Sequence, residues 1–416
     1  MSVRHRTRAA GGAVALAMSV MALAGCSGDS GGTETAGLAG ATTPPPASPV
    51  ASVPATPSAA ATPVDDGPPS AERELKRVTR ITGALTPKSV VASSTGHVVA
   101  QNMIYTHTVS VYDQDHELVK TIKDRITPAD FGHDRFTEPV QGGPVEAAFS
   151  PDGKHLWVSN YSMYGPGFAH PGDDVCSPSS GVDRSFLYRV DTSSWKVDGV
   201  VRVGAVPKFV EATPDGRTVL VTNWCTWDLS VVDTATLKET ARVKLGGRYP
   251  RGIAISADSR TAYVAIMGGT SILRVDLAGI LAGKDGDEVL EKLSTPGGGP
   301  RHLNLSPDGK YLYVTLNDDG RVAKVDARTG KVLRKATTGQ APRSSVLSPD
   351  GTALFVVNYE SDTVSQVRTR DMKVLDSKSV DHHPIGITYN PVTDEVWVCS
   401  YVGSITVFAD RAETTD

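Results

Sequence analysis

The sequence predicts an all-β protein built as a seven-bladed β-propeller. Three observations lead to this prediction. A short turn motif recurs along the chain, each copy is followed by residues that favour β-strand, and a segment near the N-terminus matches the end of a repeat. A repeat of about 42 residues with four strands is typical of one propeller blade. Most of the 416 residues then belong to one folded unit, although length alone would suggest two or three domains.

The recurring turn has the form Ser-Pro-Asp-Gly. Proline at its second place and glycine at its fourth suit a type I turn between two strands. Complete or partial copies begin at residues 150, 213, 256, 306, 348 and 390, so the spacing is near 42 apart from two insertions. A weaker unit with its turn at residues 93–96 precedes them and brings the number of blades to seven.

Each turn leads into a run of β-branched and aromatic residues, as in Leu312-Tyr313-Val314 and Val396-Trp397-Val398. This composition favours β-strand. In several repeats a second run follows and ends in aspartate, as at Asp233, Asp276 and Asp326. We expect these aspartates to accept hydrogen bonds from backbone amides of the next turn, a structural role.

The last repeat stops after Phe408, one strand short of a complete blade. The missing strand is expected at the other end of the chain, because residues 74–80 match residues 331–337, the last strand of an earlier repeat. Residues 73–82 should therefore complete the final blade and close the ring. Closure removes the exposed strand edges that invite aggregation. The predicted propeller covers residues 73–410.

The first 25 residues have the organisation of a secretory signal, with three arginines, a short apolar run and then small residues. Leu23-Ala24-Gly25-Cys26 resembles the lipobox of bacterial lipoproteins. This resemblance implies that Cys26 is acylated and anchors the protein at the extracytoplasmic face of the cell membrane. An ordinary secreted protein is the alternative. Residues 26–72, rich in Pro, Ala, Ser and Thr, predict a disordered tether, and residues 411–416 a disordered tail.

A second motif lies in the strands that follow the turns. Its form is close to Tyr-Val-Thr-Asn, as at residues 220–223, 313–317 and 355–358. Together with the turn, this motif resembles the YVTN-repeat β-propeller family over residues 73–410. The resemblance implies the fold but no single function, since relatives include binding proteins, sugar lactonases and redox-cofactor domains.

A proline opens the first strand of each predicted blade, and in five of the seven blades a basic residue follows it. These five residues are Lys88, Lys208, Arg251, Arg301 and Arg343. Repeat geometry places equivalent positions near one mouth of the central channel, where converging positive charge favours an anion. Arginine suits a carboxylate or a phosphate. The alternative is that these side chains form ion pairs with neighbouring blades or extend into solvent.

Residues near the same mouth add Tyr161, Asn223, Trp224 and His302 as candidate ligand-binding residues. Exposed aromatic side chains beside polar groups are typical of binding surfaces, although Tyr161 and Trp224 could equally serve only to fill the ends of the blades.

Three cysteines lie beyond Cys26. Cys176 and Cys225 fall in corresponding loops of adjacent blades, so we predict a disulfide between them in an oxidising compartment. Cys399 falls in a predicted buried strand, where it would serve as a small apolar residue.

Two functional hypotheses follow from these residues. The first is a membrane-anchored extracytoplasmic binding module, expected to be monomeric, that takes an anionic small molecule or a protein partner. The second is a lactonase- or lyase-like enzyme at the same mouth, with Glu146, Glu211 and His302 as acid–base candidates. A net charge of −4 argues against nucleic-acid binding. Known metal-ligand spacings, a hydrolase elbow and a dinucleotide fingerprint are missing, so no metal, cofactor or catalytic residue is assigned.

Overall fold

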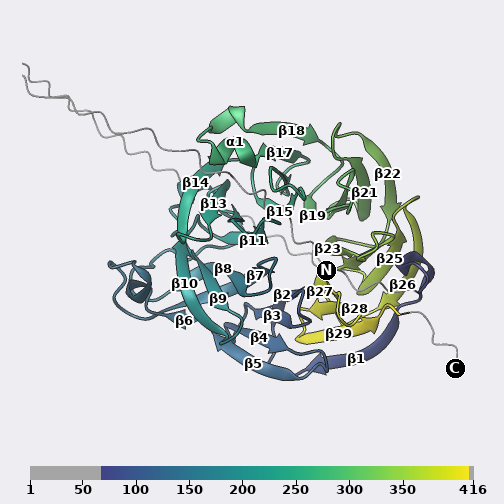
Figure 1. The fold of residues 1–416 in the computed structure, drawn as a ribbon, viewed down its shortest axis with the longest axis horizontal. Helices are drawn as coiled ribbons and strands as arrows, with labels where there is room; N and C mark the ends of the chain where they lie inside the picture. Colours follow the sequence, from purple (N-terminus) through teal and green to yellow (C-terminus); the bar gives the residue numbers. More distant parts are fainter. Residues whose placement is uncertain (1–66, 412–416) are drawn as a thin grey trace, which may run out of the picture. The chain divides into compact units, whose positions relative to one another are not determined.

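Seven antiparallel sheets form a ring in the computed structural model, which describes residues 67–411 (Figure 1). The predicted seven-bladed β-propeller is therefore confirmed. Cys26 and the predicted signal segment lie outside the described residues. Within residues 67–411, no helix has the length and apolar character needed to cross a membrane.

The blades are numbered here in chain order, and the first strand of each lies at the centre of the ring. Blade 1 contains β2 (Pro87–Ala92), β3 (Val98–Asn102), β4 (Thr108–Tyr112) and β5 (Leu118–Lys123). Blade 2 contains β7 (Val140–Phe149), β8 (His155–Tyr164), β9 (Phe186–Asp191) and β10 (Lys196–Arg202), with the short β6 (Arg125–Ile126) beside β7. Blade 3 contains β11 (Pro207–Ala212), β12 (Thr218–Asn223), β13 (Asp228–Asp233) and β14 (Lys238–Lys244).

The remaining blades repeat this order. Blade 4 contains β15 (Pro250–Ile255), β16 (Thr261–Ile266), β17 (Ile272–Asp276) and β18 (Leu290–Ser294). Blade 5 contains β19 (Pro300–Leu305), β20 (Tyr311–Leu316), β21 (Arg321–Asp326) and β22 (Val332–Thr337). Blade 6 contains β23 (Pro342–Leu347), β24 (Ala353–Asn358), β25 (Thr363–Arg368) and β26 (Lys373–Ser379). Blade 7 contains β27 (Pro384–Asn390), β28 (Glu395–Ser400) and β29 (Ser404–Ala409), with β1 (Lys76–Thr82) as its fourth strand.

Blade 7 joins the two ends of the described chain. β1 runs antiparallel to β29, with Lys76 opposite Ala409 and Thr82 opposite Ser404. Just before β1, the short 3-10 helix η1 (Ser70–Glu72) lies within the segment that was predicted to be tether. Its first residue, Ser70, donates its hydroxyl to Asp410 and accepts a hydrogen bond from Gln366 at 2.7 Å. Ordered chain thus begins before residue 73, because Ser70 has polar partners on blades 6 and 7.

The hydrophobic core lies between neighbouring blades. The layer between blades 7 and 1 is an example, with Trp397 and Cys399 of β28 packed in one cluster with Val98 and Tyr112 of blade 1. The rings of Tyr112 and Trp397 are 6.0 Å apart. Each sheet buries side chains on both faces, which accounts for the dense β-branched and aromatic runs of the sequence.

The Ser-Pro-Asp-Gly turns connect the first and second strands of the blades. In blade 5 the Ser306 hydroxyl donates to Asp308 at 2.6 Å and accepts from the backbone N–H of Tyr311 at 2.9 Å. Gly309 has a φ of +69°, a left-handed conformation that glycine adopts without cost.

The aspartates that end the third strands behave as predicted. Asp233 accepts a hydrogen bond from the backbone N–H of Thr236, and Asp326 from that of Thr329, both at 2.7 Å. Asp276 accepts from Gly279 at the start of α1 (Leu277–Leu281). Their role in closing the next turn is confirmed.

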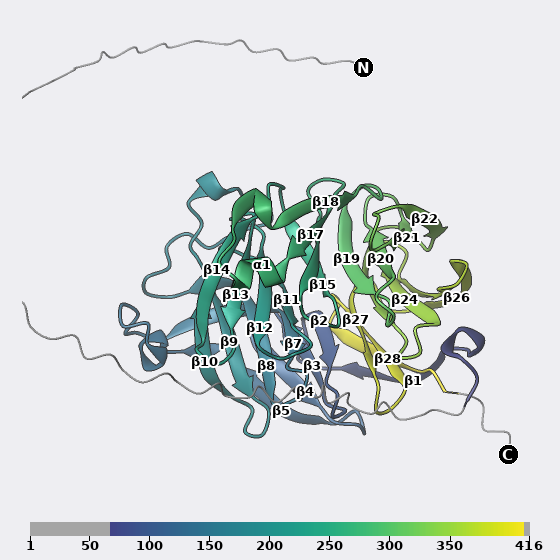
Figure 2. The same cartoon turned by 45° about the horizontal axis from the view of Figure 1, so that its top comes forward.

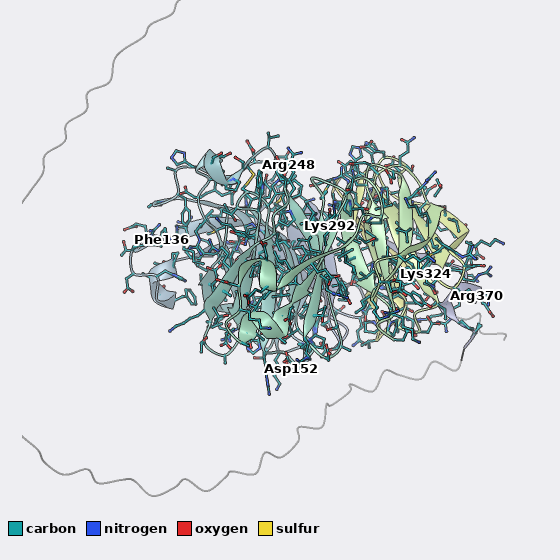
Figure 3. All side chains as sticks on the ribbon, turned by 90° about the horizontal axis from the view of Figure 1, so that it is seen from above. Phe136, Asp152, Arg248, Lys292, Lys324 and Arg370 are labelled. Carbon is teal, nitrogen blue, oxygen red and sulfur yellow. A yellow bond between two sulfur atoms is a disulfide. The ribbon has the colours of Figure 1, made fainter. Side chains whose placement is uncertain are left out.

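The propeller has two distinct ends. Figure 3 shows Asp152, in the first Ser-Pro-Asp-Gly turn, and Arg248, in the chain that returns to β15, at opposite ends of the molecule. The segments that return from the fourth strand of one blade to the first strand of the next lie at the Arg248 end. The loops between second and third strands lie at the same end, because antiparallel strands alternate in direction. The tilted view shows the first strands β11, β15 and β19 side by side at the centre (Figure 2).

Blade 2 carries an annex that the sequence analysis does not predict. β6 pairs with Val140 and Gln141 at the extended start of β7, and η2 (Pro128–Phe131) follows β6. The rings of Phe136 and Phe168 stack at 5.0 Å, and both contact Phe186. These aromatic residues form a small core of their own. The insertion that carries Phe168 accounts for the longer spacing between the turns at residues 150 and 213. Two further 3-10 turns, η3 (Pro178–Ser180) and η4 (Gly286–Glu288), lie in loops.

Candidate anion-binding site

A β-bulge follows the proline of every first strand. The pairing of β11 with β12 shifts between Pro207 and Phe209, and equivalent shifts follow Pro87, Pro144, Pro250, Pro300, Pro342 and Pro384. The residue after the proline therefore has no partner directly opposite it. Bulges change the direction of a side chain, and this one is present wherever the sequence places the candidate basic residues.

One cavity of about 360 Å³ gathers all five of these basic side chains. Its lining is Lys88, Met103, Tyr161, Asp174, Lys208, Trp224, Arg251, Met267, Arg301, Arg343, Tyr359 and Tyr401. The basic residues come from five different blades, so only the closed ring brings them together. A cavity of this size matches the small-molecule sites of proteins.

Two of the five basic residues form ion pairs. Lys208 Nζ lies 2.6 Å from an Asp174 carboxylate oxygen, and Arg251 Nη2 lies 2.7 Å from Glu146 Oε1. Arg251 also donates to the backbone carbonyl of Lys208 at 2.6 Å. The alternative weighed from the sequence, ion pairing with a neighbouring blade, is thus correct for Lys208, whose partner lies in the blade 2 insertion, while Arg251 pairs with a residue two blades away.

Lys88, Arg301 and Arg343 have no carboxylate partner among residues 67–411. Arg301 is 2% exposed and donates to the backbone carbonyl of Arg343 and, at 3.4 Å, to the Ser344 hydroxyl. Arg343 lies over the Tyr359 ring at 4.2 Å, and its Nε has no hydrogen-bond partner in the described part of the chain. Lys88 is 6% exposed, with Nζ 5.2 Å from the centre of the Tyr401 ring. The cavity therefore holds uncompensated positive charge.

Burial and mutual repulsion lower the pKa of these cations. Burial, followed by the charges of Arg301, Arg251 and Lys208, brings the pKa of Lys88 well below its usual value. Burial lowers the pKa of Lys208 to about 8, although Asp174 opposes this change. Burial and the nearby Arg251 lower the pKa of Arg301. An anion in the cavity would relieve the repulsion and favour the charged forms.

Aromatic rings form much of the wall. Tyr161 and Trp224 both lie close to Lys208, with ring centres 4.3 and 4.9 Å from Nζ. The Tyr161 hydroxyl donates to the Asp174 carboxylate, and the Trp224 indole N–H donates to the Asp174 backbone carbonyl, both at 3.1 Å. Tyr161 and Trp224, which the sequence nominated, are thus placed at the cavity, where they also hold the Asp174 loop.

A disulfide fixes that loop. Cys176 and Cys225 are bonded, as predicted, with Cα atoms 5.2 Å apart. Asp174 is two residues from Cys176, and Trp224 is next to Cys225, so the bond ties both wall residues to one point. Cys399 is a buried free thiol, and burial raises its pKa to about 12, which suits the inert role expected of it.

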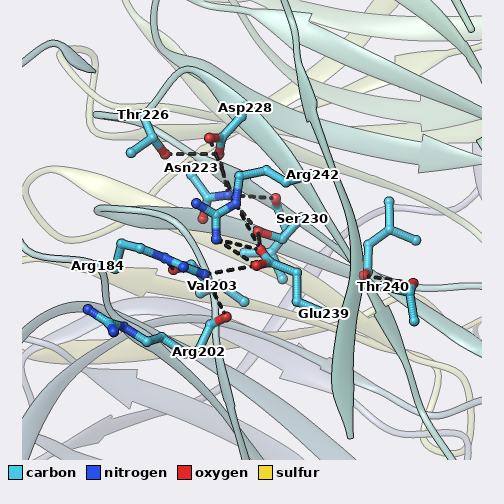
Figure 4. A network of polar contacts seen from close by, with 12 residues as sticks. Arg184, Arg202, Val203, Asn223, Thr226, Asp228, Ser230, Glu239, Thr240 and Arg242 are labelled. Carbon is cyan, nitrogen blue, oxygen red and sulfur yellow. Dashed lines mark hydrogen bonds and ion pairs between the residues drawn. The ribbon is translucent and has the colours of Figure 1, made fainter. Parts of the chain in front are cut away.

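Asn223 does not line the cavity and is a correction to the predicted site. Its side-chain amide donates to Asp228 at 2.7 Å and to Ser230 at 2.8 Å, within the polar network of Figure 4. Asn358 repeats this role toward Ser365. The asparagine of the strand motif joins the second strand to the third, which explains its recurrence without a ligand.

His302 also lies elsewhere. It is one residue past Arg301 on β19 and lines a second cavity, of about 520 Å³, that is bordered by the first strands of all seven blades. The His302 ring accepts a hydrogen bond from the backbone N–H of Ser345 at 3.0 Å and contacts Phe209. Burial and two neighbouring arginines lower its pKa to about 3, so the ring is neutral at physiological pH.

The sequence analysis missed Met103, Asp174, Met267, Tyr359 and Tyr401 as cavity residues. Asp174 lies in a blade 2 insertion with no counterpart in the repeat. The other four follow the last residue of a second strand, as Trp224 does. Their shared place directly after the second strand of a blade is the signal that an alignment of the repeats would have revealed.

The described residues contain one group of potential metal ligands, formed by His155, Asp191 and Asp198. Asp198 already binds the Arg189 guanidinium at 2.9 and 3.2 Å, and Asp191 accepts from the Ser194 backbone and hydroxyl. These carboxylates have protein partners, so we assign no metal to them.

The fold resembles that of a solved protein with a different sequence. A chain of hydrazine synthase from Kuenenia stuttgartiensis aligns with a TM-score of 0.60 and 17% sequence identity, over 81% of this chain and 99% of that chain. At this identity the likeness shows a common propeller fold and nothing further. The chain matches no protein-family model, and no curated protein matches it significantly.

Proposed function

We propose that this propeller is a binding module that takes a compact anion in the basic cavity. The observation that carries the proposal is the meeting of five basic side chains from five blades around one cavity of about 360 Å³. Asp174 and Glu146 compensate only Lys208 and Arg251. Buried cations without partners are costly, so a site that keeps them supports a ligand of opposite charge.

The cavity suggests the kind of anion. Three basic side chains lack a carboxylate partner in the described chain, which favours a ligand with two or three negative charges. Guanidinium groups bind carboxylate and phosphate oxygens in pairs. Tyrosine, tryptophan and methionine walls favour a ligand with a small organic body. A di- or tricarboxylate, or a compact organic phosphate, meets these requirements.

Calorimetric titration of the full-length protein with citrate and with pyrophosphate tests the proposal. At least one probe should bind saturably, and added salt should weaken its binding. Arg343→Met removes a cavity charge whose side chain makes no hydrogen bond within residues 67–411, and it should weaken binding by about tenfold or more. Arg260→Gln, an exposed arginine outside the cavity lining, is the control. The proposal fails if neither probe binds, or if both variants bind as the parent does.

We further propose that the protein is a lipoprotein of the YVTN-repeat type, held outside the cytoplasm by lipid on Cys26. Support comes from the Leu-Ala-Gly-Cys sequence and the repeated strand motif. The Cys176–Cys225 bond fits an oxidising compartment. The basic cavity would then meet solutes outside the cell.

An enzyme of the lactonase or lyase kind is the second candidate, and one observation favours it. Glu211 lies in the second cavity with His302, and burial raises its pKa to about 8, so it holds a proton near neutral pH. Such a carboxyl can act as a general acid. Lactone hydrolysis that is lost in Glu211→Gln but kept in Arg343→Met would select this function at the second cavity.

A further inference from the structure

Lys88 differs from the other lysine of the cavity, Lys208, in having no polar partner among residues 67–411. Its Nζ makes no hydrogen bond or ion pair among residues 67–411. Glu146 and Asp174 are carboxylates whose charges act on Lys88, and each is paired with another cation, Glu146 with Arg251 at 2.7 Å and Asp174 with Lys208. Lys208 has the same position in blade 3 but is bound to Asp174 at 2.6 Å. The structure thus contains one engaged lysine and one unengaged lysine at equivalent positions.

The surroundings of Lys88 favour an unprotonated amine. The bulge after Pro87 sets its side chain in the cavity wall, where it is 6% exposed. Burial and the charges of Arg301, Arg251 and Lys208 lower its pKa well below the usual lysine value. Desolvation and a neighbouring cation are the two conditions that make a lysine amine nucleophilic.

The same cavity holds guanidinium groups that suit a carboxylate. Arg301 and Arg343 have no acidic partner in the described chain, and a bound carboxylate there would lie in the same cavity as the Lys88 amine. A ligand with a carbonyl next to its carboxylate could present the carbonyl carbon to that amine. We propose that Lys88 captures a 2-oxo acid as a reversible imine in this cavity, an inference that rests on the proposed anion-binding function.

The step is balanced without a further reactant. The Lys88 nitrogen lone pair forms a bond to the carbonyl carbon, the carbonyl π pair moves to oxygen, and one nitrogen proton passes to that oxygen to give a carbinolamine. The second nitrogen proton then joins the departing hydroxyl as water, and the nitrogen lone pair forms the carbon–nitrogen double bond. One amine and one ketone become one imine and one water, with no oxidation or reduction. Hydrolysis reverses the step and releases the 2-oxo acid.

Reductive trapping tests the inference. The full-length protein is incubated with 2-oxoglutarate and borohydride, and the modified peptides are identified by mass spectrometry. A stable adduct is expected on Lys88. Glutarate, the same dianion without the carbonyl, should protect Lys88 from labelling but form no adduct. Calorimetric titration with each compound is carried out in parallel.

Three variants make the result specific. Lys88→Met should lose the adduct, and Lys292→Met, which changes an exposed lysine outside the cavity lining, should keep it. Lys88→Arg introduces the side-chain type found at this position in blades 4 to 6. A guanidinium forms no imine, so this variant should bind glutarate without labelling.

The inference is overturned if both dianions bind but Lys88 is unlabelled, or if exposed lysines react as readily as Lys88. If neither dianion binds and 2-oxoglutarate does not label Lys88, the inference fails together with the proposal that the cavity takes dicarboxylates.

Discussion

Arg251 of β15 and Glu146 of β7 form a buried ion pair between blades 4 and 2, with Nη2 and Oε1 2.7 Å apart. Arg251 lines the basic cavity, and Glu146 lines the second cavity. Their side chains are only 4% and 10% exposed. The pair therefore links the walls of the two cavities. Within it, the Glu146 carboxylate neutralises the charge of Arg251, one of the five basic residues.

Breaking this pair should destabilise the propeller. Glu146→Gln leaves the Arg251 guanidinium buried without a compensating charge, which is expected to lower the free energy of unfolding by about 3–5 kcal/mol. Chemical denaturation measures the change, and the exposed Glu288→Gln is the control. Replacing both partners, as Glu146→Met with Arg251→Met, should recover much of the loss. Equal stability of Glu146→Gln and the parent would show that the pair is not buried as described.

Asp174 competes with a bound anion for Lys208. Asp174→Asn removes the carboxylate at 2.6 Å and leaves the loop held by the disulfide. Because the Asp174 side chain is largely exposed, the gain should be modest, at most about 1 kcal/mol or roughly fivefold tighter binding. Citrate titration well below pH 8, where Lys208 is protonated, measures it. Asp173→Asn is the matched control, and weaker binding in Asp174→Asn would contradict the competition.

Anion affinity should fall as the pH rises through about 8. Lys208 is charged below its pKa of about 8 and loses its charge above that pH, while Asp174, Arg251 and Arg301 are the charged groups that act on it. An anion favours the protonated form, so binding above pH 8 should take up a proton. Titrations in buffers of different ionisation enthalpy detect this uptake. Lys208→Arg should lose the dependence near pH 8, and an unchanged profile in that variant would refute the assignment.

Reducing the disulfide should weaken both stability and binding. The bond closes a loop with a sequence separation of 49 residues, for which chain entropy gives about 4 kcal/mol. The Cys176→Ser, Cys225→Ser variant should unfold at a lower temperature and bind citrate less tightly, since Trp224 and the Asp174 loop lose their shared anchor. Cys399→Ser is the control, because it replaces a cysteine that is a buried free thiol and leaves the disulfide intact. Unchanged binding in the double variant would show that the loop does not shape the cavity.

Lipid attachment is expected at Cys26. Cells that express the full chain and are fed labelled palmitate should yield a labelled protein in the membrane fraction. Cys26→Ser should lose the label and leave the membrane fraction. Label that persists in Cys26→Ser, or a parent protein without label, would refute the anchor.

The fold could be predicted because its determinants are local and repeated. A turn such as residues 306–309 and the strand after it carry their own signal through proline, glycine and β-branched residues. The annex of blade 2 could not be predicted in this way, because Phe136, Phe168 and Phe186 pack only after the chain has folded back.

The candidate site was predicted where the repeat fixes a position and missed where the contacts are unique. The residues after the opening prolines converge because every blade places them alike. Asn223 also occupies a repeated position, but its partners Asp228 and Ser230 give it a structural role that spacing does not reveal. Asp174 belongs to an insertion, so its contact with Lys208 depends on the fold of one loop.

The most direct measurement of the central claim is a crystal structure of the protein in the presence of selenate, an anion whose anomalous scattering identifies its position. Our account predicts selenate in the basic cavity, within hydrogen-bond distance of Arg301 or Arg343. A cavity that contains only water, while selenate occupies sites elsewhere on the protein, would contradict it.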